Sequence, residues 1–193
     1  MNLISKNRLI LGIAAMLVIV SPMAVWAATG FLTIRDAAVV TSGDRVDRAA
    51  MTTRGNIPKD GSGGAFGYGI ITSAGIIVTT THKGVLDSEL QSGPQDPVFH
   101  NHYVLLGPNP SKCGNNPSVI DITFDSPGQL AVGNANVALK DLPKSSEGFS
   151  QSNNVQNVVS FKLDPKFKNN NPNDELEAVC VTDITPAQNK VVK

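Results

Sequence analysis

Short stretches rich in Val, Ile, Thr and Phe recur along most of the chain, and Gly, Pro, Asn and Ser separate them. This pattern is typical of β-strands joined by turns, because β-branched and aromatic side chains pack well on a pleated sheet. We expect an all-β fold. The predicted strands cover residues 31–35, 64–72, 75–81, 98–106, 119–124, 129–132, 136–139, 155–163 and 176–184.

About nine strands with turn signals between them predict an antiparallel β-sandwich or a barrel-like domain. Gly133-Asn134 and residues 73–75 are signals for tight hairpins. Residues 41–64 are rich in Gly and Pro, so they predict a long loop or arm, with a short helix over residues 44–51. We expect a single domain over residues 28–193, in which residues 28–64 supply an N-terminal strand and this arm.

The first 27 residues have the organisation of a secretory signal peptide. Lys6 and Arg8 precede the apolar residues 9–20, and Ala27 ends a small-residue cleavage site. Cleavage there predicts a protein that is secreted, periplasmic or exposed on the cell surface. Retention of the segment as an N-terminal anchor is the alternative that the sequence leaves open.

The composition narrows the classes of partner. Lys and Arg together number 16, as do Asp and Glu, so the chain has a net charge close to zero and no basic run. It lacks the electrostatic footprint of a nucleic-acid-binding protein. Because no apolar run of about 18 residues follows the signal peptide, we expect no membrane span after cleavage.

Cys113 and Cys180 are the two cysteines of the chain. An even pair in an exported protein predicts a disulfide bond. The bond would fasten the loop around Cys113 to the strand over residues 176–184. Closing a loop of this length would stabilise the fold by about 4 kcal/mol in the chain-entropy model.

The three histidines, His82, His100 and His102, lie close together in the sequence. Alternation along residues 98–106 places His100 and His102 on one face of a strand, about 6.6 Å apart, where both can bind one ion. His82 follows the preceding predicted strand, so pairing of the two strands would add a third imidazole. Three histidines with an open fourth position form one type of catalytic zinc site, and imidazole suits copper equally well.

This arrangement is similar to the zinc site of the α-type carbonic anhydrases, in which a His-x-His strand pairs with a third histidine from a neighbouring strand. The resemblance covers three residues and differs in order, since His82 comes first here. It implies a metal-dependent hydrolase or hydratase, in which a metal-bound hydroxide attacks a small-molecule substrate.

Three carboxylates, Asp87, Glu89 and Asp96, lie between His82 and His100. Each is a candidate fourth ligand, or a candidate hydrogen-bond acceptor for a ligating histidine. Each also suits a solvated loop, and the histidines themselves suit a structural or surface role without metal.

Two functions of different classes follow from these features. The first is an exported protein that binds zinc or copper through His82, His100 and His102, with or without catalysis by a metal-bound hydroxide. The second is a metal-free structural or adhesive protein of the cell envelope. It would self-associate by donating the strand in its N-terminal arm, residues 29–64, to a neighbouring molecule.

Overall fold

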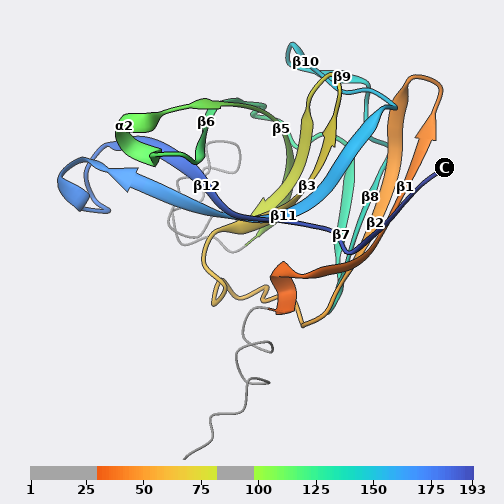
Figure 1. The fold of residues 1–193 in the computed structure, drawn as a ribbon, viewed down its shortest axis with the longest axis horizontal. Coiled ribbons are helices and arrows are strands. Elements are labelled where there is room, and N and C mark those ends of the chain that lie inside the picture. The colour runs from red at the N-terminus through yellow and green to blue at the C-terminus, as the bar shows by residue number, and fades with distance from the viewer. Residues whose placement is uncertain (1–29, 82–97) are drawn as a thin grey trace, which may run out of the picture.

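The computed structural model describes residues 30–81 and 98–193, and it confirms an all-β fold (Figure 1). A 3-10 turn, η1, covers Gly30–Leu32, and a short helix, α2, covers Pro110–Cys113. The strands of the first half are β1 (Ile34–Ser42), β2 (Arg45–Thr53), β3 (Phe66–Thr72), β4 (Ile76–Thr81), β5 (Phe99–Pro108) and β6 (Pro117–Ile122). The later strands are β7 (Gln129–Val132), β8 (Asn136–Lys140), β9 (Ser145–Ser146), β10 (Phe149–Ser150), β11 (Val155–Phe167), β12 (Leu176–Pro186) and β13 (Asn189–Val192), with a 3-10 turn, η2 (Lys168–Asn170), between β11 and β12.

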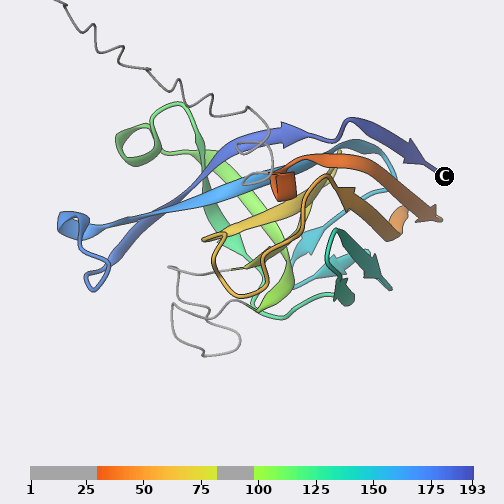
Figure 2. The ribbon, with the colours of Figure 1, turned by 90° about the horizontal axis from the view of Figure 1, so that it is seen from below.

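Six of the strands close into a barrel in the order β11-β12-β6-β5-β4-β3, and every neighbouring pair in it is antiparallel. A five-stranded sheet in the order β13-β1-β2-β8-β7 packs against one side of the barrel. Both predicted hairpins, β3–β4 and β7–β8, are confirmed. Figures 1 and 2 show the β11–β12 hairpin extending beyond the rest of the barrel.

The barrel wall that faces the five-stranded sheet is buried on both of its sides. On β3, Phe66, Tyr68 and Ile70 point toward the sheet and pack in one core with its side chains, among them Met51 and Leu139. The residues that alternate with them point into the barrel, where a second core forms. The members of this second core are Val78, Val104, Val159, Phe161 and Val181.

The arm predicted over residues 41–64 is wrong in its first part. β1 and β2 form an antiparallel hairpin that turns at Gly43, which has a φ of 61°. β1 lies between β13 and β2, so it is an inner strand of the sheet and not a free arm. Residues 54–65 remain a loop. The strand-exchange hypothesis stays a prediction, without β1 as its donor segment.

The helix predicted over residues 44–51 is also wrong, because residues 45–51 belong to β2. The register shifts between Val40 and Thr41, which leaves Asp47 of β2 as an extra residue. Val46 and Ala49 are therefore both buried although they are three residues apart, a spacing that resembles a helical period.

The strand β13 was not predicted, and it pairs in parallel with β1 at the edge of the sheet. Its residues are exposed on both faces, so no alternation of polar and apolar side chains marks it. The predicted signal peptide, residues 1–27, lies outside the described residues. Within residues 30–81 and 98–193, no helix has the length and apolar character needed to cross a membrane.

The predicted disulfide bond is confirmed. Cys113 at the end of α2 joins Cys180 of β12, with a Cα–Cα distance of 5.4 Å. Cys180 is also the residue of β12 that pairs with Ser118 of β6. The disulfide therefore lies where the barrel closes on itself.

Replacing both cysteines by Ala is expected to lower the free energy of unfolding by about 4 kcal/mol, because the unfolded chain regains the freedom of a long loop. Urea denaturation followed by circular dichroism measures this change. Wild-type protein reduced with dithiothreitol is the control and should show the same loss. An unchanged unfolding midpoint in both samples would contradict a stabilising role for the bond.

Candidate functional site

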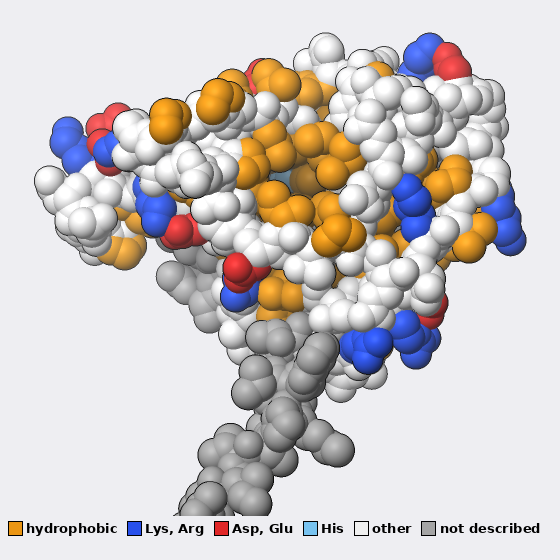
Figure 3. Space-filling view, viewed as in Figure 1, with side chains coloured by type: hydrophobic (Ala, Val, Ile, Leu, Met, Phe, Trp, Pro, Cys, Tyr) orange, Lys and Arg blue, Asp and Glu red, His pale blue; other side chains and the backbone are white. Residues whose placement is uncertain are grey.

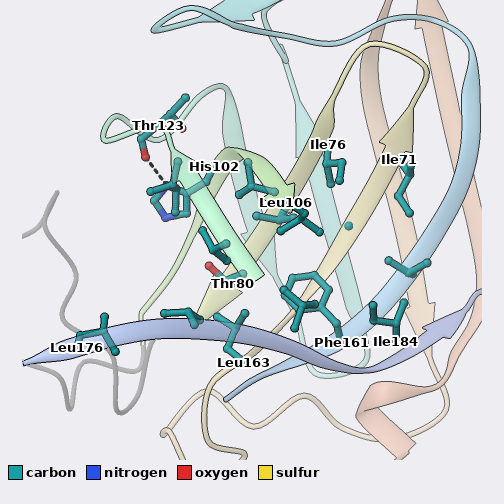
Figure 4. A pocket seen from close by; sticks show the side chains of 18 residues that line it. Ile71, Ile76, Thr80, His102, Leu106, Thr123, Phe161, Leu163, Leu176 and Ile184 are labelled. Atoms are coloured by element: carbon teal, nitrogen blue, oxygen red, sulfur yellow. Dashed lines mark hydrogen bonds between the residues drawn. The ribbon is translucent and has the colours of Figure 1, made fainter. Parts of the chain in front are cut away.

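The interior of the barrel holds a cavity of about 230 Å³. Figure 3 shows it as a hollow surrounded by hydrophobic side chains, and Figure 4 shows the side chains that point into it. All six barrel strands contribute. The lining residues are Gly69, Ile71, Ile76, Val78, Thr80, His102, Val104, Leu106, Val119, Ile122, Thr123, Val159, Phe161, Leu163, Leu176, Val179, Val181 and Ile184.

The strand β5 shows how alternation builds this lining. His102, Val104 and Leu106 line the cavity, as the alternation of side chains along one strand requires. Tyr103 points the other way and is buried in the core against the sheet, and Leu105 is 53% exposed. Neighbouring residues of one strand thus face the cavity, the core against the sheet, and solvent.

Gly69 of β3 leaves part of the hollow unfilled. A Cβ atom added there would lie 3.5 Å from Val78, Val159 and Phe161, which is ordinary van der Waals contact. Gly67, two residues earlier, is different, because an added Cβ would lie 2.4 Å from the carbonyl oxygen of Thr79. The backbone therefore requires glycine at position 67, whereas glycine at position 69 widens the cavity.

The polar side chains of the lining are Thr80, His102 and Thr123. Nδ1 of His102 lies 2.8 Å from the carbonyl oxygen of Thr123 (Figure 4). A carbonyl oxygen only accepts hydrogen bonds, so Nδ1 is the protonated nitrogen, and in the neutral ring Nε2 carries the lone pair. His102 is 2% exposed, and the hydrogen bond fixes the orientation of its ring.

Thr123 follows β6 in a turn that two other residues hold in place. Its backbone N–H donates to the carbonyl of Tyr103 over 3.0 Å, and its hydroxyl accepts the N–H of Tyr103 over 3.1 Å. The carboxylate of Glu147 accepts the N–H groups of Phe124 and Asp125, each over 2.8 Å. These two hydrogen bonds hold the pKa of Glu147 below its usual range.

Two buried tyrosines fasten the barrel wall to the other layer. Burial raises the pKa of Tyr103 to about 12, and it also raises that of Tyr68. Both phenols stay protonated at neutral pH and donate hydrogen bonds. Tyr68 donates to the carbonyl of Phe31 over 2.8 Å, and Tyr103 donates to that of Pro143.

The structure brings together two of the predicted metal ligands. The rings of His100 and His102 lie with their centroids 4.6 Å apart, in an edge-to-face arrangement. His82 and the three carboxylates, Asp87, Glu89 and Asp96, lie outside the described residues. Within residues 30–81 and 98–193, no three His, Cys, Asp or Glu residues gather closely enough to hold a metal ion. The site of three histidines stays a prediction.

Sequence reasoning missed the apolar cavity. A signal was present in residues 66–72 and 76–81, which are apolar or small at consecutive positions and not only at alternate ones. Such a run indicates a strand buried on both faces. It does not reveal whether the second buried face meets another layer or the inside of a barrel.

Glu147→Gln should destabilise the protein at neutral pH, because the amide keeps the shape of the carboxylate and loses its charge. Since the folded-state pKa of Glu147 is lowered, its contribution is present above the ordinary pKa of Glu and is lost as the pH falls through the lowered value. The unfolding midpoints of variant and wild type should therefore differ at pH 7 and converge as the pH falls below the lowered pKa of Glu147. A difference that persists unchanged at low pH would exclude the charged form of Glu147 as its cause.

Comparisons of this chain with models of protein families, with curated proteins and with solved structures found no match. Two features of the site bear most directly on function: the apolar lining of the cavity and the fixed orientation of His102.

Proposed function

We propose that this protein binds a small, neutral, apolar molecule inside its barrel. The observation that carries the proposal is the cavity of about 230 Å³, whose lining contains no Lys, Arg, Asp or Glu. Small-molecule sites in proteins are concave, mostly apolar and largely preformed, and they hold a few polar groups that orient the ligand. Thr80, His102 and Thr123 are the polar groups available here.

The lining of the cavity also favours a ligand without charge. A charged molecule would lose its hydration on entry and would find no side chain of opposite charge in the wall. Water gains little there as well, because apolar cavities offer it too few hydrogen-bond partners. A neutral apolar molecule gives up no strong hydration on entry and removes its own surface from water.

A pair of fluorescent probes tests this preference. N-phenyl-1-naphthylamine is neutral, and 1-anilinonaphthalene-8-sulfonate has the same ring skeleton with an added sulfonate. The neutral probe is expected to bind at least ten times more tightly, a difference of about 1.4 kcal/mol. Fluorescence titration of the mature protein measures both constants. Equal binding of the two probes, or no binding of either, would overturn the proposal.

Neighbouring positions on β5 locate the bound probe. Val104 lines the cavity, and Leu105 points outward from the same strand. Val104→Phe should fill the cavity and weaken binding of the neutral probe at least tenfold, whereas Leu105→Phe should leave it unchanged. Circular dichroism confirms the fold of each variant, because overpacking a core costs about 1–3 kcal/mol. Full binding by Val104→Phe would place the probe elsewhere.

A metal site at the polar end of the cavity is a second candidate function. One observation favours it: the Nδ1–H of His102 is held by a backbone carbonyl, the arrangement by which proteins orient ligating histidines. His100 lies beside it on the same strand. His100 and His102, together with His82, would hold zinc or copper, and such an ion would supply an activated water as a nucleophile.

Elemental analysis of the mature protein, purified without chelator, tests the metal site. About one zinc or copper ion per chain is expected, lost when His100 and His102 are both replaced by Asn, which keeps much of their volume. The metal content of the His82→Ala variant tests separately whether the third histidine takes part in binding the ion. Absence of metal from the wild type, even after zinc or copper is supplied and the excess removed, would exclude this function. Binding of the neutral probe would be unaffected by that result.

A further inference from the structure

The cavity opens directly to the surface on the face shown in Figure 3, so the walls of the barrel decide which molecules fit. Most of the lining is Val, Ile and Leu, and two other residues stand out on one wall. Gly69 of β3 has no side chain, and Phe161 of β11 carries the one phenyl ring of the described lining. The two strands are neighbours, and Gly69 pairs with Val159, two residues before Phe161.

The fold itself does not require glycine at position 69. Its φ lies outside the left-handed region, and an added Cβ atom would lie 3.5 Å from side-chain atoms of Val78, Val159 and Phe161. The structure therefore has room for a methyl group there. Glycine inside a strand is less stable than alanine, because it loses more conformational freedom on folding. Such a glycine often marks a place where a ligand approaches the backbone closely.

The phenyl ring of Phe161 borders this space in a fixed position. A Cβ atom added at Gly67 would lie 2.9 Å from Cζ of Phe161, so the tip of the ring occupies the space above Gly67. Phe161 is buried and packs in the second core with Val78 and Val159 (Figure 4). The space above Gly69, bounded by these three side chains, is a small recess in the cavity wall beside an aromatic ring.

We propose that the ligand carries a planar ring system, which lies in the recess above Gly69 and against Phe161. This inference rests on the proposed function and narrows its class of ligand. An unbranched alkyl chain is narrow and gains little from a wider point in the barrel, whereas a ring system needs that width. Aromatic rings also attract one another beyond the effect of the area they bury. Gly69 is then a specificity-determining residue that favours rings over chains.

Two matched ligands test this preference. 2-Naphthol and 1-decanol are both neutral, with the same number of carbon atoms and one hydroxyl each. The polar end of the cavity therefore serves both alike, and they differ in being a planar ring system or a flexible chain. Isothermal titration calorimetry of the mature protein gives the dissociation constant of each.

Gly69→Ala fills the recess with one methyl group. It is expected to weaken binding of 2-naphthol about tenfold and to leave that of 1-decanol within about threefold, because one methylene of misfit in an apolar pocket has this size of effect. The midpoint of urea unfolding should stay the same or rise, since alanine is the better strand residue. Weaker binding without loss of stability separates a ligand contact from a structural glycine.

Two further variants control for other causes. Val119→Ile also adds a single carbon atom to the lining, but from β6, away from the strands that bound the recess. It should change the two dissociation constants by similar factors. Phe161→Leu keeps an apolar side chain and removes the ring, so it should weaken binding of 2-naphthol about fivefold and spare 1-decanol. Circular dichroism checks that each variant is folded.

Equal effects of Gly69→Ala on the two ligands, or a lowered unfolding midpoint in that variant, would overturn the role of Gly69. A wild-type protein that binds 1-decanol but not 2-naphthol would overturn the preference for rings and leave the binding function intact. A wild-type protein that binds neither of them, nor N-phenyl-1-naphthylamine, would overturn the proposed function itself.

Discussion

The constraint on which the rest of the structure depends is the double burial of the barrel wall formed by β3, β4, β5 and β11. One side of this wall packs against the five-stranded sheet through residues such as Tyr68, Ile77 and Val158, and the other side forms the barrel interior. Apolar burial on both sides supplies the driving force for association of the two layers. Because each residue of these strands faces one layer or the other, a shift of register by one position would exchange the two cores.

Closure of the barrel is the second requirement, and it is met with little backbone pairing. β12 pairs with β11 from Leu176 to Pro186, and the chain then leaves the barrel to form β13 beside β1. β6 is short, so it meets β12 through Ser118 and Cys180 alone. The disulfide at this point compensates for the missing ladder, because it limits how far the strands separate even when their hydrogen bonds open.

These two requirements together explain why the interior is hollow. The sheet fixes the outer side of the wall strands, β6 and β12 close the barrel opposite them, and the side chains that line the enclosed space are mostly Val, Ile and Leu. Gly69 adds no side chain at all. The polar end is ordered by the turn at Thr123, which Tyr103 and Glu147 hold, so that His102 keeps one ring orientation. The chemistry of the barrel interior is therefore that of a preformed apolar cavity with one imidazole ring in a fixed orientation.

The all-β class, both tight hairpins, the disulfide and the shared face of His100 and His102 followed from the sequence, because each depends on local pattern or on residue counts. Four features did not follow from the sequence: the inner position of β1, the strand β2, the parallel edge strand β13, and the choice between sandwich and barrel. Alternation records that a face is buried and not what covers it. The bulge at Asp47 gave β2 a helical spacing, and β13 is exposed on both faces.

The cavity was decided by tertiary structure alone, since its lining comes from six strands distributed between Gly69 and Ile184. Only closure of the barrel places those side chains around one space.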